Sequence, residues 1–207
     1  MIEIRIVLVI LTLTGLIECK MKPKVVGGQF GKIKKFPHSA FLNVICVDLK
    51  TGKKTPWICG ASIVNEYISL TAAHCLHGCT ADSQIFMSVG HAVRGEGAVS
   101  SVDMYYLHEG YRSARSDNDI GLVRLQTPLQ FDANVKRVAL MKDPPYFEKA
   151  QIAGWGMIDE VKKTSADRLY YTDQWVWKSR ECKKIVKYLP NGALCASSGN
   201  DHSYSSR

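Results

Sequence analysis

The sequence has no apolar run long enough to cross a membrane. Its longest one follows Arg5 near the N-terminus, and roughly 12 residues are too few for a hydrocarbon core about 30 Å thick. A short apolar run behind a basic residue at the start of a chain is typical of a secretory signal peptide. We therefore expect residues 1–19 to be a signal peptide and the protein to be secreted, without membrane attachment after signal removal.

Internal repeats, low-complexity segments and basic blocks interleaved with aromatic residues are also missing. The formal net charge of +8 is spread over short pairs such as Lys34-Lys35 and Lys183-Lys184. A scattered basic surface of this kind does not predict a nucleic-acid-binding site. With 46% hydrophobic and 22% charged residues, the composition is that of an ordinary globular protein.

A complete metal-binding motif is absent as well. His74, Cys75, His77 and Cys79 lie close together in the sequence, but no second C-x-x-C or H-x-x-x-H follows at the spacing of a zinc site. We therefore expect neither a metal ion nor another cofactor.

The chain contains seven cysteines, and Cys19 falls at the end of the predicted signal peptide. Six remain in the mature chain, an even number that predicts three disulfides in an oxidising compartment. Spacing alone does not choose among the possible pairings. The six are Cys46, Cys59, Cys75, Cys79, Cys182 and Cys195.

Helical periodicity is scarce, whereas short runs rich in β-branched and aromatic residues recur between turn residues. The first two runs flank residues 50–54 and predict a hairpin. One or two small helices are predicted, and the clearest begins at Ser179 as N-cap and ends before Pro190, with one apolar face. Residues 127–145 resemble a linker between two β lobes. The predicted strands cover residues 41–47, 58–70, 84–89, 100–106, 120–125 and 150–153. This pattern favours an antiparallel all-β sandwich or barrel without deciding between the two.

Four short segments, in this order, resemble the trypsin and chymotrypsin family of serine proteases. They read KVVGG at residues 24–28, LTAAHC at 70–75, DNDIGL at 117–122 and AGWG at 153–156. The resemblance implies an all-β fold of two six-stranded antiparallel barrels with the active site between them. Residues 25–127 would form the first barrel and residues 128–207 an incomplete second one, together a peptidase domain spanning 25–207.

The resemblance assigns catalytic roles to His74 and Asp119. A serine protease needs an imidazole that accepts the proton of the nucleophile and a carboxylate that fixes the tautomer of that imidazole. Asp117 competes with Asp119, because residues two apart point the same way in a strand. The motif match selects Asp119, and we expect Asp117 to be a loop residue that caps the turn.

The same resemblance predicts a zymogen that is cleaved between Lys24 and Val25. Residues 20–24 would be a short activation propeptide, and the activating partner a protease that cuts after basic residues. The family also implies disulfides between Cys59 and Cys75 and between Cys182 and Cys195. Cys46 and Cys79 remain as the third pair.

The family's nucleophile lies in a Gly-Asp-Ser-Gly-Gly segment, and no such segment occurs in these 207 residues. We therefore expect the chain to be a fragment, inactive by itself, of a monomeric endopeptidase that acts on proteins or peptides. A non-catalytic homologue with a binding or regulatory role is the alternative. Primary specificity is left open, because the family's specificity residue lies near the missing serine.

Overall fold

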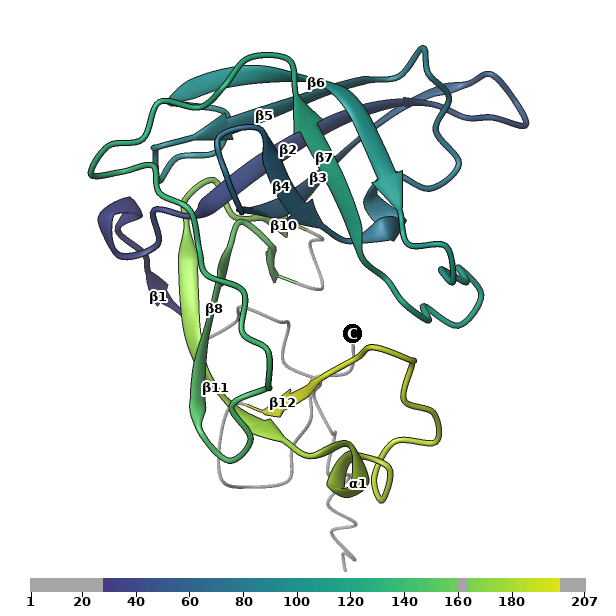
Figure 1. The fold of residues 1–207 in the computed structure, drawn as a ribbon, viewed down its shortest axis with the longest axis vertical. Helices are drawn as coiled ribbons and strands as arrows, with labels where there is room; N and C mark the ends of the chain where they lie inside the picture. The colour runs from purple at the N-terminus through teal and green to yellow at the C-terminus, as the bar shows by residue number, and fades with distance from the viewer. Residues whose placement is uncertain (1–27, 160–163, 198–207) are drawn as a thin grey trace, which may run out of the picture.

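The structure, a computed structural model, describes residues 28–159 and 164–197. Its largest unit is a closed antiparallel barrel in the order β2-β3-β4-β7-β6-β5, seen at the top of Figure 1. The strands are β2 (Ser39–Val47), β3 (Lys54–Ile63), β4 (Ile68–Thr71), β5 (Gln84–Val89), β6 (Ala98–Leu107) and β7 (Gly121–Leu125).

Alternating side chains build the core of this barrel. In β7, Gly121, Val123 and Leu125 are buried, while Leu122 and Arg124 face outward, as expected for a strand with one face in the core. Leu42 of β2 and Met87 of β5 are fully buried. These side chains belong to one core, and its buried members are Ala40, Leu42, Val44, Cys46, Ile63, Cys75, Leu76, Ile85, Met87, Val89, Val123, Leu125, Leu129 and Val135.

The predicted hairpin at residues 50–54 is present, since β2 and β3 pair from Val47–Lys54 to Ser39–Ser62. The predicted single strand at 58–70 is wrong, because the chain turns between β3 and β4. The side-chain Oδ1 of Asn65 accepts hydrogen bonds from the amides of Tyr67 and Ile68, both at 2.8 Å. Such an Asx turn ends one strand and starts the next.

The second lobe is an open sheet below the barrel in Figure 1. Its central strand β11 (Tyr170–Trp177) pairs with β8 (Lys149–Gly154) on one side, and with β1 (Gln29–Phe30) and β12 (Cys195–Ser197) on the other. A separate ribbon joins β9 (Met157–Asp159) to β10 (Thr164–Ser165). Although β1 lies within the range assigned to the first barrel, its pairing with β11 places it in the second lobe.

Helices are short. They comprise two 3₁₀ helices, η1 (Ile33–Lys35) and η2 (Ala73–Cys75), and within the described residues a single α-helix, α1 (Ser179–Cys182). The longer helix predicted to reach Pro190 is therefore wrong, and its N-cap is Lys178 instead of Ser179. The residues beyond Cys182 turn toward the barrel and bond to it instead of continuing a regular helix. No helix in the described part of the chain is long and apolar enough to cross a membrane.

Aromatic side chains join the two lobes. Trp155, which follows β8, packs edge-on against Phe41 of the barrel with ring centroids 5.8 Å apart. Its indole N–H donates to the carbonyl of Ala92 at 2.9 Å. Phe36, Phe41, Trp155 and Leu169 form a second, smaller core, which is shared between the lobes.

Candidate active site

His74 lies on η2, directly after β4. Its neighbours Ala73 and Cys75 are buried and fix the backbone of the short helix. The Cys59–Cys75 disulfide ties η2 to β3, and the indole N–H of Trp57 donates to the carbonyl of Cys75 at 3.0 Å. The imidazole between these anchors remains 62% exposed.

Asp119 meets His74 from the loop between β6 and β7. Its Oδ2 lies 2.7 Å from Nδ1 of His74, and its Oδ1 accepts the backbone N–H of His74 at 2.8 Å. A carboxylate in this position favours the tautomer with a proton on Nδ1, so Nε2 is left as the basic nitrogen. The two residues given catalytic roles in the sequence are thus adjacent, although 45 positions separate them.

The pair stands at the edge of a cleft of about 940 Å³. His74 and Asp119 border it from the barrel, together with Tyr111 of the β6–β7 loop. Val186 and residues 188–196 border it from the second lobe. An exposed imidazole beside a cleft between two lobes can reach a substrate that lies across both of them.

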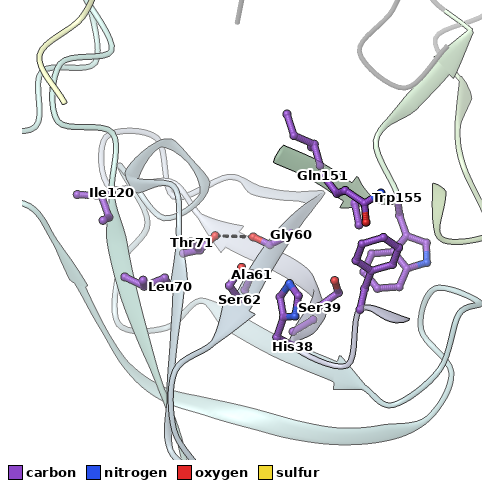
Figure 2. A pocket seen from close by; sticks show the side chains of 14 residues that line it. His38, Ser39, Gly60, Ala61, Ser62, Leu70, Thr71, Ile120, Gln151 and Trp155 are labelled. Atoms are coloured by element: carbon purple, nitrogen blue, oxygen red, sulfur yellow. Dashed lines mark hydrogen bonds between the residues drawn. The ribbon is translucent and has the colours of Figure 1, made fainter. Parts of the chain in front are cut away.

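A smaller cavity of about 430 Å³ lies between the barrel strands β2, β3 and β4 and the β8 side of the second lobe (Figure 2). Ile152 borders both this cavity and the cleft. His38 and Ser39 line it near Trp155. The hydroxyl of Thr71 donates a hydrogen bond to the carbonyl of Gly60 at 2.8 Å. Partial burial lowers the pKa of His38.

Asp117 is not the turn-capping residue that the sequence predicted. It is buried, with 1% exposure, and its Oδ1 accepts the hydroxyl of Tyr188 and the amide of Asn191, the latter at 2.9 Å. Arg115 lies 2.9 Å from its Oδ2. The hydrogen bond from Tyr188, followed by those of Asn191 and the charge of Arg115, lowers the pKa of Asp117. Arg115, two positions before Asp117, is the sequence signal that corresponds to this ion pair.

The His/Cys cluster seen in the sequence is accounted for by disulfides. In the described chain, ligand atoms of Cys59, His74 and Cys75 lie within 4.8 Å of one another. Both sulfurs belong to one disulfide, however, and only a thiolate binds a metal strongly. Cys79 is bonded to Cys46, and the ring of His77 packs edge-on against Tyr111.

The structure contains the two disulfides that the family resemblance implied and the third pair that was left by elimination. Cys46–Cys79 and Cys59–Cys75 lie in the barrel, whereas Cys182–Cys195 closes the segment after α1 in the second lobe. The predicted cleavage site at Lys24 and Val25, with the signal peptide before it, lies outside the described residues.

Comparison with known proteins places this arrangement in a family. Residues 25–205 match the family model described as Trypsin. The chain belongs to the trypsin family. Trypsin alpha of Drosophila erecta is 28% identical over 86% of this chain and 68% of its own length. Trypsin of Sarcophaga bullata is 37% identical over 47% of this chain and 39% of its own length.

A solved structure of the scabies mite inactivated protease paralogue S-D1 superimposes with a TM-score of 0.71 at 22% identity. The match covers 87% of this chain and 78% of that one. At this identity it shows the fold alone, and together with the closed barrel it confirms the predicted trypsin-like all-β class.

Proposed function

We propose that this trypsin-family chain is the His/Asp-bearing part of a secreted serine endopeptidase that is made as a zymogen. The observation that carries the proposal is the contact between His74 and Asp119 at the edge of the interlobe cleft. The family match supports a proteolytic function in general. Three disulfides fit an extracellular protein.

In this proposal His74 is the general base. With Nδ1 bonded to Asp119, its Nε2 takes the proton of a serine hydroxyl as that oxygen attacks the scissile carbonyl. The imidazolium so formed is stabilised by the Asp119 carboxylate, and it then protonates the leaving amine. Water hydrolyses the acyl-enzyme through the same base. The proposal names no serine among the 207 residues, because they contain no Gly-Asp-Ser-Gly-Gly segment.

The partners proposed with this function are protein or peptide substrates and an activating protease that cleaves after Lys24. The KVVGG segment at residues 24–28 supports this cleavage site. We propose a monomer that needs neither a metal ion nor a cofactor, since the chemistry is supplied by side chains alone.

A non-catalytic trypsin homologue with a binding role is the second candidate. The missing Gly-Asp-Ser-Gly-Gly segment favours it. The scabies mite protein of similar fold is described as an inactivated protease paralogue, which is a precedent within the same architecture.

The transcript beyond codon 207 separates the two candidates, and activity then tests the base. The 207-residue chain should not turn over peptide amides after cleavage at Lys24. A longer product with Gly-Asp-Ser-Gly-Gly should turn them over, and His74→Ala should lower its kcat by about 10⁴-fold or more. His91→Ala is the matched control, because His91 pairs with Glu96 on the surface.

Activity unchanged by His74→Ala would contradict the assigned role. A codon for another residue in place of the serine would favour the non-catalytic homologue.

A further inference from the structure

Among the described residues, Asp117 is a buried charged group to which the proposed catalytic chemistry gives no role. Asp117 belongs to the barrel loop that also carries Asp119, but both residues that bond to its Oδ1 come from the second lobe. In Figure 1 this loop descends from the barrel toward the segment that follows α1. Buried carboxylates are costly unless they are paired and hydrogen-bonded, so such a residue needs an explanation.

The contacts between the loop and the second lobe are reciprocal. The amide of Asn191 donates to Oδ1 of Asp117 at 2.9 Å, and the carbonyl of Asn191 accepts the amide of Asn118 at 2.8 Å. The Tyr188 hydroxyl adds a third bond. Arg115 pairs with Asp117 and lies 5.8 Å from the ring centre of Tyr188. The loop is thus held through both backbone and side chains.

The backbone on both sides of Asp117 is in the left-handed region. Ser116 has φ of 53° and Asn118 has φ of 52°, although neither is glycine. Residues persist in this region where surrounding contacts determine their conformation. The side chain of Asn118 donates to the carbonyl of Gly110 at 2.9 Å and braces the loop from the other side. Asp119 is the next residue, so its carboxylate is placed by this same backbone.

The far end of these contacts is itself anchored. Tyr188 and Asn191 lie within the segment closed by the Cys182–Cys195 disulfide. A short covalent loop limits the conformations open to its residues. The second lobe therefore offers the Asp117 loop a constrained partner.

We propose that Asp117, Tyr188 and Asn191 form an interlobe latch that positions the Asp119 carboxylate against His74. Asp117 is then a positioning residue, and this part of the inference rests on the catalytic pair of the proposed function. Through the latch, the second lobe controls the geometry of a catalytic pair that lies entirely in the barrel.

Hydrogen–deuterium exchange of the full 207-residue chain tests the latch, because the His74 amide donates to Oδ1 of Asp119. Tyr188→Phe removes one hydroxyl and keeps the ring. We expect it to speed exchange of the His74 amide about five-fold, the effect of losing one hydrogen bond, while amides of β2 and β5 keep their rates. Asp117→Ala should have a larger effect, and Asp117→Asn, which keeps an acceptor for Asn191, a smaller one than Asp117→Ala.

Asp103→Asn is the matched control, because Asp103 of β6 forms a partly exposed ion pair with Arg124 of β7, and neither residue belongs to the latch. It should leave exchange at His74 unchanged. The low-field proton resonance of His74 Nδ1, which reports its bond to a carboxylate, gives a second measure and should broaden in Tyr188→Phe.

If Tyr188→Phe changes neither exchange nor resonance at His74, the latch is wrong while the protease proposal stands. Equal acceleration at His74 and in β2 would mean a general loss of stability and would also overturn it. If the unmodified protein lacks the low-field resonance and His74 protection, the catalytic pair itself is wrong.

Discussion

The two lobes differ in how completely they are closed. The first is a barrel in which each of six strands pairs on both sides, and its core takes buried residues from β2, β3, β5 and β7 and partly buried ones from β6. The second, within the described residues, is an open sheet whose small core borrows Phe36 and Phe41 from outside that sheet. In a closed barrel every strand finds its backbone hydrogen-bond partners within the barrel. The edge strands of an open sheet leave backbone groups that neighbouring segments must cover.

The candidate catalytic pair and the opposite wall of the cleft lie in different lobes. His74 and Asp119 both belong to the self-sufficient lobe, so the candidate pair rests on the better-packed part of the molecule. The wall of the cleft opposite them belongs to the dependent lobe. We therefore expect substitutions in the barrel core to lower the stability of the fold, and substitutions in the second lobe to change the geometry of the cleft.

The strongest test compares two fully buried leucines, one from each core. Leu42→Ala should lower the free energy of unfolding by about 4 to 5 kcal/mol, because a closed barrel cannot collapse around the cavity. Leu169→Ala should lower it by about 2 to 3 kcal/mol, because the open sheet relaxes more easily. Urea denaturation gives both values. Equal losses would contradict the expected difference in relaxation between the two cores.

Removal of disulfides should sharpen the same contrast with a somewhat smaller effect. Replacing both Cys46 and Cys79 by Ala opens a link that spans 33 positions and should cost about 4 kcal/mol of stability, largely in the barrel. The same change at Cys182 and Cys195, 13 positions apart, should cost about 3 kcal/mol. In the variant without the Cys182–Cys195 disulfide, limited proteolysis should cut the second lobe before it cuts the barrel. Cleavage within the barrel instead would contradict the division.

The smallest expected effect is a local response to acid at the junction of the lobes. Because hydrogen bonds from Tyr188 and Asn191 and the charge of Arg115 lower the pKa of Asp117, its carboxylate stabilises the fold above the ordinary aspartate pKa of about 3.9. That contribution is lost as the pH falls through the lowered pKa.

The protection of residues 186–193 against hydrogen exchange, taken relative to the intrinsic exchange rate at each pH, should therefore fall below about pH 4 in the native chain. In Asp117→Asn it should depend less on pH. Asp48, Asp103 and Glu181 also have lowered pKa values but lie elsewhere, so the comparison with this variant isolates Asp117. An identical pH profile in both proteins would show that Asp117 does not cause the response.

Local pattern predicted the barrel strands better than those of the second lobe. The predicted strand at residues 84–89 coincides with β5, because its apolar residues face a continuous core. β11 was missed, although it is the central strand of the second sheet. It contains Asp173 and a buried Gln174, and a polar side chain at a core position hides the alternation on which such a prediction depends.

The candidate site was predicted unevenly for a similar reason. His74 and Asp119 stand in short segments that resemble the trypsin and chymotrypsin family, and this resemblance predicted their roles without coordinates. The role of Asp117 could not be predicted in this way. Its partner Tyr188 lies 71 positions away, in a segment that the sequence assigned to a helix.

The sequence by itself indicated the candidate pair, through a family resemblance, and determined where the cysteines stand and the antiparallel β character. These follow from residue types and local spacing, because both act over a few neighbouring positions. Tertiary structure alone decided that Nδ1 of His74 lies 2.7 Å from Asp119, and that the second lobe bonds to the loop beside it. Such contacts depend on how strands close into a barrel, and no local preference encodes that closure.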